Sequence, residues 1–518
     1  MLGRKKHHLL SLVLLLLFAL MALAGCGSAT APAQPAASSS GSVQSSASAA
    51  ESSEAGLAPY TLKWYTCGSV QTNPQPVYDK MNEILTAKIN ATLEVVTFDW
   101  GQYNDKLKIL MASSDPFDLC FTSSWTNDYT SAVSKGAYVA LDDLLSVNGK
   151  TIQATIPDKY WNATRVGGKI YGIPNYQIFA TVKGVSVKKE LLDKYAFDKA
   201  SVKRLADLEP LLESIKNGEP GIVPYLPDQF SPFGYFDLDS GYLYDPMLGA
   251  QYPLYINVKA NDNKVINIYE TPEAMAYYKL MRSWYEKGYI RKDAASQKDL
   301  RAEQKSGLYG MFATGAMKPG NEVDTEAFTG FPVVDIQTAP AYISTSGITA
   351  TLTSISKTSK DPARAMMFYD LMFADKALYN LMCFGIEGTH YKKISDDTVE
   401  AIADSGYNPS TDWQFGNQFN AFYRKGQQPG IWEETMKLNE SAAPSPLLGF
   451  SYDKEPMKSE NAQIDAIVAQ YLPGLITGTL NPEKALPELN EKLLKAGLEK
   501  VMTDAQTQID AWRSESGK

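Results

Sequence analysis

The strongest constraint on the fold is an alternation of strand and helix patterns in the first third of the chain. Residues 60–65 and 93–98 predict strands, and each is followed by a helical stripe of apolar residues, at 74–89 and 103–112. A short buried strand is predicted at 118–121. Strand–helix–strand order predicts a parallel sheet with helices on both faces. We therefore expect an α/β fold, in which ligands bind beyond the carboxyl ends of the strands.

Residues 1–25 have the features of an export signal. A positive segment at 4–6 precedes an apolar run at 9–24, which is shorter than the roughly 20 residues of a spanning helix. The run ends in Leu23-Ala24-Gly25-Cys26, which resembles the lipobox of bacterial lipoproteins. That resemblance implies signal cleavage before Cys26, lipidation of this cysteine, and a mature protein anchored to the outer face of the cell membrane. The alternative is an ordinary secretory signal with a chance cysteine.

The segment that follows the signal has the composition of a flexible tether. Residues 26–58 consist almost entirely of Ser, Ala, Gly, Pro and Gln. Such a segment has too little apolar surface to offset the entropy lost on ordering, so we expect it to be disordered. Folded structure should begin near Pro59. The remaining chain, about 460 residues, is too long for one ordinary core and predicts two or more domains.

Net charge and histidine content argue against two classes of function, nucleic-acid binding and zinc catalysis. Residues 1–25 hold three basic and no acidic residues, so their removal moves the net charge from −9 to −12, which argues against nucleic acid as a partner. His390 is the one histidine left in the mature chain, too few for a zinc enzyme. Asp237, Asp239 and Asp245 do not match the spacing of an EF-hand. We expect no metal and no cofactor.

Several segments, taken in order, resemble extracellular solute-binding proteins of bacteria. Residues 115–119 and 136–142 resemble parts of the first lobe of that family. Residues 168–176 resemble the segment that crosses to the second lobe through a hinge, and residues 342–350 resemble the return crossing. The resemblance implies a two-lobed periplasmic-binding-protein fold with a hinge and a central cleft.

The same resemblance predicts the domain organisation. Lobe 1 is expected at 59–176, completed by a return segment at about 343–375, and lobe 2 at 177–342. A mostly helical C-terminal region, 376–518, would complete the lobes. Within it, Asn481-Pro482-Glu483 predicts a helix start, because it supplies an N-cap, a proline at the first helical position and an acid in the first turn.

The second half of the chain indicates a subgroup and, with it, a function. Residues 384–391 and 449–453 resemble the aldouronate-transport lipoproteins, which end in a domain of unknown function. This implies a monomeric binding protein, not an enzyme, that captures a small solute, foremost an oligosaccharide, by lobe closure. It would deliver the ligand to the permease and ATPase subunits of an ABC importer. The alternative is a surface lipoprotein glycosidase, whose chemistry needs only two carboxylates.

Trp125 is the first candidate for ligand contact. Sugars present C–H faces to aromatic rings and hydroxyls to polar side chains, so their sites combine Trp or Tyr with Asp, Asn or Gln at loop ends. Trp125 follows the strand predicted at 118–121, with Asn127 and Asp128 beside it. A residue at this position lies beyond the carboxyl end of the strand, where a ligand is expected. The alternative is a tryptophan that caps the edge of the lobe.

Further candidates come from the hinge and from the later part of the chain. The resemblance places Asn175, Tyr176 and Gln177 in the hinge, where their side chains would form the floor of the cleft. Tyr235 would close over the ligand from lobe 2, and Trp413 is a similar candidate from the later half. Packing between elements is the alternative for each of them. The roles of Glu387 and His390 stay open at this point.

Overall fold

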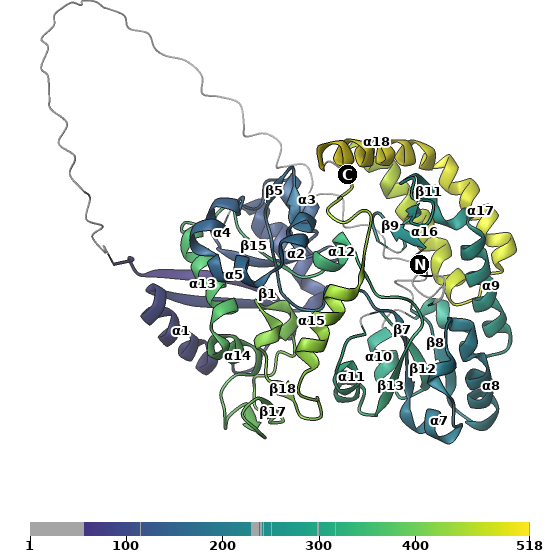
Figure 1. Cartoon of the computed structure of the whole chain (residues 1–518), viewed down its shortest axis with the longest axis horizontal. Helices are drawn as coiled ribbons and strands as arrows, with labels where there is room; N and C mark the ends of the chain where they lie inside the picture. The colour runs from purple at the N-terminus through teal and green to yellow at the C-terminus, as the bar shows by residue number, and fades with distance from the viewer. Residues whose placement is uncertain are drawn as a thin grey trace, which may run out of the picture. The chain divides into compact units, whose positions relative to one another are not determined.

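The computed structural model describes residues 56–113, 115–228, 238, 241, 243–249, 251–297, 300–315 and 317–516. The chain from Leu57 onward forms one compact unit (Figure 1). The predicted signal and Cys26 lie outside the described residues, as does most of the predicted tether. No helix in the described part of the chain combines the length and the apolar character needed to cross a bilayer.

The first sheet has five strands in the order β2-β1-β3-β15-β6. The strands span Tyr60–Cys67 (β1), Ala91–Phe98 (β2), Leu119–Thr122 (β3), Ile173–Pro174 (β6) and Leu352–Ile355 (β15). β2 and β3 both run parallel to β1, as the sequence predicts. β15 departs from the parallel prediction, because it returns to the sheet from the opposite direction and pairs antiparallel with both β3 and β6; β6 therefore has the same direction as β3.

Helices cover both faces of this sheet, as expected from the order of the elements. Leu62 and Trp64 on one face of β1 belong to a core that contains α1 and α13, whereas Tyr65 and Cys67 on the other face belong to a core that contains α2. The helices span Gln75–Ile89 (α1), Trp100–Ser113 (α2) and Pro362–Ala374 (α13). The carboxyl ends of β1, β2 and β3 meet at one edge, next to the start of α2.

Smaller elements complete the first lobe. The helices are Tyr129–Ser134 (α3), Asp142–Asn148 (α4), Lys150–Thr155 (α5), Asp158–Trp161 (α6), Lys376–Phe384 (α14) and Ile431–Ser441 (α15). The short strands are Arg165–Val166 (β4), Lys169–Ile170 (β5), Tyr391–Lys393 (β16), Thr398–Ala401 (β17) and Tyr423–Arg424 (β18). α14 packs against α1, so the chain beyond the return strand contributes to the first lobe as well.

The second lobe is built on a sheet with the order β13-β7-β12-β8. Its strands are Gly184–Lys188 (β7), Val223–Leu226 (β8), Tyr309–Thr314 (β12) and Val333–Gln337 (β13). A smaller sheet combines Tyr244–Pro246 (β9), Leu254–Asn257 (β10) and Val265–Asn267 (β11). The helices of this lobe are Lys189–Lys194 (α7), Glu209–Gly218 (α8), Pro272–Glu286 (α9), Leu300–Lys305 (α10) and Asn321–Thr329 (α11).

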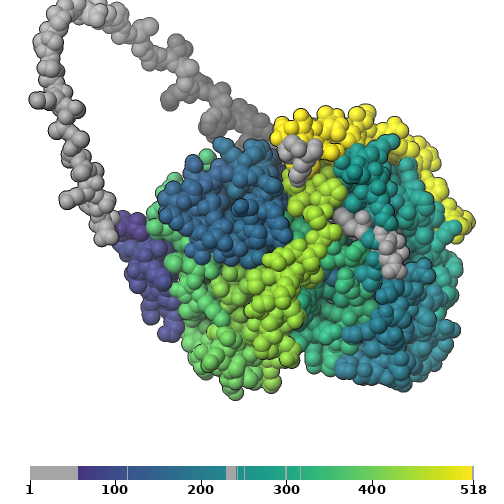
Figure 2. All heavy atoms as spheres, in the orientation of Figure 1, coloured from purple at the N-terminus to yellow at the C-terminus, as the bar shows by residue number. Residues whose placement is uncertain are grey.

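Three stretches of chain connect the two lobes. The first, residues 175–183, runs from β6 to β7, and the second runs back from β13 through β14 (Tyr342–Ile343) and α12 (Thr345–Ile348) to β15. A third follows α15 and contains β19 (Ala443–Pro444), which pairs in parallel with β14. Figure 2 shows α15, in yellow-green, at the surface along the seam between the lobes. The sequence predicted the first two crossings; the third is a finding of the structure.

The C-terminal helices pack on the second lobe. They are α16 (Lys458–Ile476), α17 (Pro482–Lys495) and α18 (Leu498–Ser516), which lie beside α9 and β11 (Figure 1). The predicted helix start is confirmed, since the Asn481 side chain accepts a hydrogen bond from the backbone N–H of Glu483 at 2.9 Å. Ile464, Leu489 and Ile509 are fully buried in the core of this lobe.

Candidate ligand-binding cleft

Three tryptophans gather at the carboxyl edge of the first sheet. Trp100 begins α2 directly after β2, and Trp125 follows β3 in a short turn. Trp413 lies in a 3₁₀ turn at Asp412–Gln414, held at the end of β1 because the Gln414 amide donates to the backbone oxygen of Cys67 at 2.9 Å. We call Trp100, Trp125 and Trp413 the tryptophan platform. It lies where ligands bind on sheets of this kind.

The rings of the tryptophan platform are in contact and partly open to solvent. The Trp100 centroid lies 6.0 Å from that of Trp125 and 6.0 Å from that of Trp413, with interplanar angles of 31° and 18°. Trp125 is 54% exposed and Trp100 is 40% exposed, whereas Phe121 is buried and packs against Trp125 and Trp413. Large aromatic rings grouped at the surface mark a binding surface more often than chance exposure does.

Trp125 is held in place by the return segment and by its own turn. Its indole Nε1 donates to the backbone oxygen of Ala350 at 2.8 Å, and its backbone N–H donates to Ser123 Oγ at 3.2 Å. A ring fixed in this way loses little rotamer freedom when a ligand stacks on it. The platform is therefore prearranged for stacking.

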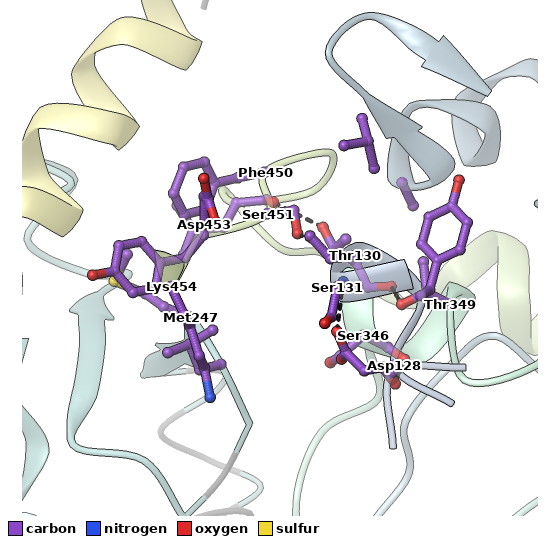
Figure 3. A pocket seen from close by; sticks show the side chains of 18 of the residues that line it. Asp128, Thr130, Ser131, Met247, Ser346, Thr349, Phe450, Ser451, Asp453 and Lys454 are labelled. Carbon is purple, nitrogen blue, oxygen red and sulfur yellow. Dashed lines mark hydrogen bonds between the residues drawn. The ribbon is translucent and has the colours of Figure 1, made fainter. Parts of the chain in front are cut away.

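A cavity of about 320 Å³ opens between the lobes, and its lining includes Ser124, the residue before Trp125, but none of the three platform tryptophans. One wall is α3 with the residues before it, beside which lie Ser346 and Thr349 of the second crossing, and the opposite wall is formed by residues 245–248, 450–455 and 458 (Figure 3). Serine and threonine are its most frequent lining residues: Ser124, Thr130, Ser131, Ser134, Ser344, Thr345, Ser346, Thr349, Ser445 and Ser451. Hydroxyl groups both donate and accept hydrogen bonds, so this lining suits a ligand that is itself rich in hydroxyls.

The two walls of the cavity touch at one point. Thr130 Oγ1 on α3 lies 3.0 Å from Ser451 Oγ on the opposite wall (Figure 3). On the hinge side, Asp245 accepts hydrogen bonds from the Ser445 hydroxyl and from the Leu447 backbone N–H. The Asp245 carboxylate therefore connects β9 to the third crossing, because one of its oxygens accepts both of these hydrogen bonds.

The second lobe holds a lysine and an aspartate near the carboxyl ends of its parallel strands. Lys183 precedes β7 beside the carboxyl end of β12, and Asp228 follows the carboxyl end of β8. Burial lowers the pKa of the Lys183 ammonium to about 8, and the Asp228 carboxylate opposes this effect. The sequence reasoning did not identify either residue.

The structure gives Asn127 and Asp128 different roles. Asn127 is buried, and its side-chain amide donates to the backbone oxygen of Phe121 and to the Tyr138 hydroxyl, so it braces the turn instead of facing the cleft. Asp128 is exposed, lines the cavity and caps α3 by accepting from the Ser131 N–H at 2.8 Å.

The hinge residues predicted to form the floor of the cleft are buried in this conformation. Asn175 has no exposed surface, its amide donates to the Gln414 backbone oxygen at 2.7 Å, and its oxygen accepts from the Tyr369 hydroxyl. Tyr176 and Gln177 are each 8% exposed. Because residues from the last third of the chain pack over them, these side chains brace the hinge instead of lining the cleft.

Three further residues considered in the sequence analysis are Tyr235, His390 and Glu387. Tyr235 lies outside the described residues, and so do Asp237 and Asp239. His390 is 1% exposed and accepts a hydrogen bond from the Ile386 N–H at 2.9 Å, while Glu387 pairs at the surface with Lys393. Within the described ranges, no three His, Cys, Asp or Glu side chains are grouped so as to hold a metal ion.

Sequence reasoning missed Trp100, although a signal for it was present. Trp100 follows the carboxyl end of a predicted strand, as Trp125 does, and the same rule applied to β2 identifies it. Nothing local marked the serines and threonines of the cavity, because they come from three separate stretches of chain, 124–134, 344–349 and 445–451.

Two lobes around a hinge, with a cleft at the carboxyl edges of the strands, define a binding protein that encloses its ligand. The chain belongs to the bacterial extracellular solute-binding protein family, whose model matches residues 73–378. A second model, a domain of unknown function (DUF3502), matches residues 446–514. Membership of this family places the protein outside the cytoplasm.

Individual relatives agree with this assignment. A carbohydrate ABC transporter substrate-binding protein of Streptococcus pneumoniae is 29% identical over 87% of this chain and 90% of its own length. The N-glycan transport solute binding protein NgtS of the same species has a similar structure, with a TM-score of 0.80 at 26% identity over 89% of this chain and 100% of NgtS. For NgtS in complex with Man5GlcNAc the TM-score is 0.70, at 26% identity over 88% of this chain and 99% of that one.

Proposed function

We propose that the chain is the substrate-binding component of an ABC importer and captures an oligosaccharide between its lobes. The observation that carries this proposal is the tryptophan platform, three rings in contact and partly exposed at the carboxyl edge of the first sheet. Aromatic rings stack on the C–H faces of sugars, and neighbouring hydroxyls bond to sugar hydroxyls. The cavity beside the platform supplies such hydroxyls.

The lobe arrangement supports capture by closure. The chain superposes better on NgtS, with a TM-score of 0.80, than on its complexes with Man1GlcNAc and Man5GlcNAc, with scores of 0.73 and 0.70. This order is expected if the described arrangement is that of the ligand-free, open protein. A ligand that touches both lobes then stabilises a closed form by its differential affinity for the two states.

The same proposal assigns the partners and the anchor. The closed form would dock on the permease, and ATP-driven opening there would release the ligand inward. Cys26, lipidated after cleavage of residues 1–25, would hold the protein at the membrane through the tether of residues 26–58. Lobe 1 would comprise 59–176 with 343–375, and lobe 2 would comprise 177–342.

One experiment distinguishes a protein that binds an oligosaccharide from one that hydrolyses it. The protein without residues 1–58 is titrated calorimetrically with Man1GlcNAc, Man5GlcNAc and other oligosaccharides, and the ligand is then recovered and analysed by mass spectrometry. Saturable binding with the ligand intact is expected. Release of shorter sugars would support the glycosidase, and the absence of binding to every oligosaccharide would remove carbohydrate from the proposal.

The anchor is tested separately in cells. We expect the full chain to be recovered with membranes and to carry a lipid on Cys26 by mass spectrometry. Cys26→Ala should be released from the membrane fraction, because the anchoring residue is lost. A Cys26→Ala protein that stays membrane-bound would contradict the lipid anchor.

A further inference from the structure

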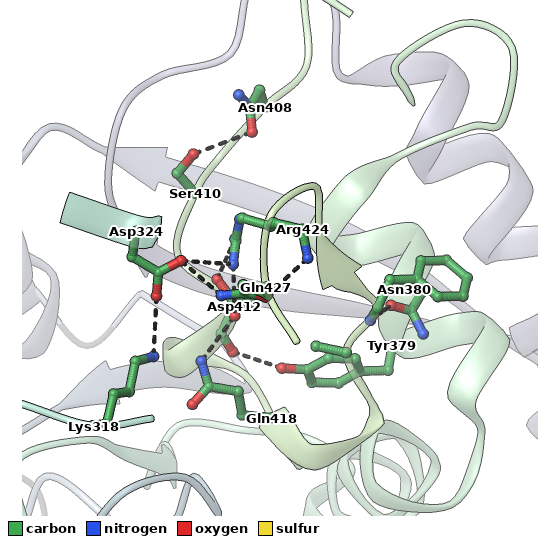
Figure 4. Close-up of polar contacts among 12 residues, drawn as sticks. Lys318, Asp324, Tyr379, Asn380, Asn408, Ser410, Asp412, Gln418, Arg424 and Gln427 are labelled. Atoms are coloured by element: carbon green, nitrogen blue, oxygen red, sulfur yellow. Dashed lines mark hydrogen bonds and ion pairs between the residues drawn. The ribbon is translucent and has the colours of Figure 1, made fainter. Parts of the chain in front are cut away.

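A set of polar side chains joins the two lobes beside the tryptophan platform. It consists of Lys318, Asp324, Asp412, Arg424 and Gln427, and we call it the interlobe network (Figure 4). Arg424 is the last residue of β18, in a small sheet of the first lobe, and Asp324 lies on α11, which packs against β13 in the second lobe. The network therefore spans the seam between the lobes.

Within the first lobe, Arg424 and Asp412 form a close ion pair. Arg424 Nη2 donates to Asp412 Oδ1 at 2.6 Å, and the Asp412 side chain is 4% exposed. Burial alone would raise the pKa of the Asp412 carboxyl, but the Arg424 guanidinium outweighs it and holds that pKa well below its ordinary value. The Gln418 amide donates to the second carboxylate oxygen at 2.8 Å. Asp412 is thus charged and fixed.

Asp412 belongs to the turn that carries the third ring of the platform. The 3₁₀ turn Asp412–Gln414 contains Trp413, whose ring lies 6.0 Å from that of Trp100. The Tyr379 hydroxyl donates to the backbone oxygen of Asp412 at 2.7 Å. The position of this turn, and with it the position of the Trp413 ring, depends on the bonds that hold Asp412.

Across the seam, Asp324 bonds to the same part of the first lobe. The Gln427 amide donates to Asp324 Oδ1 at 2.9 Å, and Arg424 Nη1 lies 3.9 Å from the same oxygen. Lys318, on the same lobe as Asp324, lies 3.5 Å from its other carboxylate oxygen. The backbones approach closely here, since a methyl group on Gly320 would come within 3.0 Å of an Ile431 side-chain carbon.

We propose that Arg424 couples the tryptophan platform to the arrangement of the lobes. Through Asp412 it positions the turn that bears Trp413, and through Asp324 it stabilises the described, open arrangement. Arg424 is a positioning residue, since it acts on the ligand through Trp413. This inference rests on the proposed function for its effect on ligand affinity. Its effect on the lobes does not depend on any ligand.

The test compares Asp324→Asn with Asp193→Asn. Both substitutions remove one carboxylate from the second lobe, but Asp193 pairs with Lys189 on its own helix and its side chain is 61% exposed. Small-angle X-ray scattering of the ligand-free proteins should depart from the described arrangement for Asp324→Asn and agree with it for Asp193→Asn. Unchanged scattering for Asp324→Asn would overturn the link between the lobes.

Affinity supplies the second readout, with Man5GlcNAc as the probe. Weakening an open-state contact makes closure easier, so Asp324→Asn should bind the sugar about two- to fivefold more tightly. Asp412→Asn should bind it more weakly, because Trp413 loses its support. Tighter binding by Asp412→Asn would overturn the positioning of Trp413, and weaker binding by Asp324→Asn would overturn the claim that Asp324 stabilises the open arrangement.

Two further controls distinguish a failure of this inference from a variant that does not fold and from a protein that binds no oligosaccharide. If Asp412→Asn does not fold, Arg424→Lys keeps the charge but loses the planar fork that reaches two carboxylates, and it should weaken binding in the same way. If the unsubstituted protein binds no oligosaccharide, the proposed function fails. The scattering comparison then still decides whether Asp324 joins the lobes.

Discussion

The rings of Trp100 and Trp413 lie nearly parallel, at an interplanar angle of 18° and a centroid distance of 6.0 Å. The two residues come from the first and the last third of the described chain, and the carboxyl ends of β1 and β2 bring them together. Trp125, from the turn after β3, completes the platform. One edge of one sheet thus assembles an aromatic surface that no single stretch of sequence contains.

Removing the most exposed ring should weaken binding without unfolding the protein. Trp125→Ala deletes a stacking face at a loop, for which we expect a loss of roughly 1–3 kcal/mol in binding free energy. Calorimetric titration with an oligosaccharide measures it. Ile109→Ala is the control, because Ile109 on α2 is 65% exposed and lies outside the platform. A lower melting temperature with unchanged affinity would mean that Trp125 belongs to the core.

Trp100 and Trp125 should act together on the ligand. Each ring packs against the other, so removal of one leaves its neighbour less well placed for stacking. We expect Trp100→Ala to weaken binding and the double variant to lose less than the sum of the single losses, by about 0.5–3 kcal/mol. A double-mutant cycle on the dissociation constants measures this coupling. Strict additivity would show that the two rings contact the ligand independently.

Asn175 should matter for stability and not for direct contact with the ligand. Asn175→Ala leaves the buried Gln414 backbone oxygen without its donor and the Tyr369 O–H without its acceptor, which should lower the free energy of unfolding by about 1–3 kcal/mol. Chemical denaturation measures the loss. An affinity change of more than tenfold with unchanged stability would instead restore the cleft-floor role that the sequence predicts.

His390 should make the folded protein sensitive to mild acid. Burial lowers the pKa of its imidazole, so on acidification the unfolded chain takes up a proton that the folded chain does not. Its stabilising effect is complete above the unfolded pKa of about 6.5 and is lost as the pH falls from there towards the lower folded value. Between about pH 8 and 5, the free energy of unfolding should fall more for the unsubstituted protein than for His390→Gln. If the free energy of unfolding depends on pH equally in both proteins, His390 is not the source of the acid sensitivity.

Local patterns predicted the elements, and long-range contacts decided the site. β1, α1 and the start of α17 were predictable because the apolar spacing and the Asn481 cap lie within one short stretch. The antiparallel return of β15 was not, since it depends on the path of the chain through the second lobe.

The same distinction explains which site predictions changed. Trp125 and Asp128 were identified by their place after a strand, and the structure shows that Asp128 lines the cavity and that the Trp125 ring is exposed. Asn175 was assigned to the cleft from its place in the hinge, but its burial comes from Tyr369 and Gln414, which lie far away in sequence. The contact of Arg424 with Asp324 likewise joins residues from two lobes, a pairing that sequence spacing does not indicate.

The central claim is that an oligosaccharide binds between the lobes on the tryptophan platform. The most direct test is a thermal-shift screen of the protein without residues 1–58 against oligosaccharides, with amino acids and short peptides as controls, run in parallel on Trp125→Ala. A ligand at about 100 times its Kd stabilises the folded state by about 2.7 kcal/mol. The account predicts a rise in melting temperature with one class of oligosaccharide, which is smaller or absent in Trp125→Ala. A rise only with peptides, or an equal rise in Trp125→Ala, would contradict it.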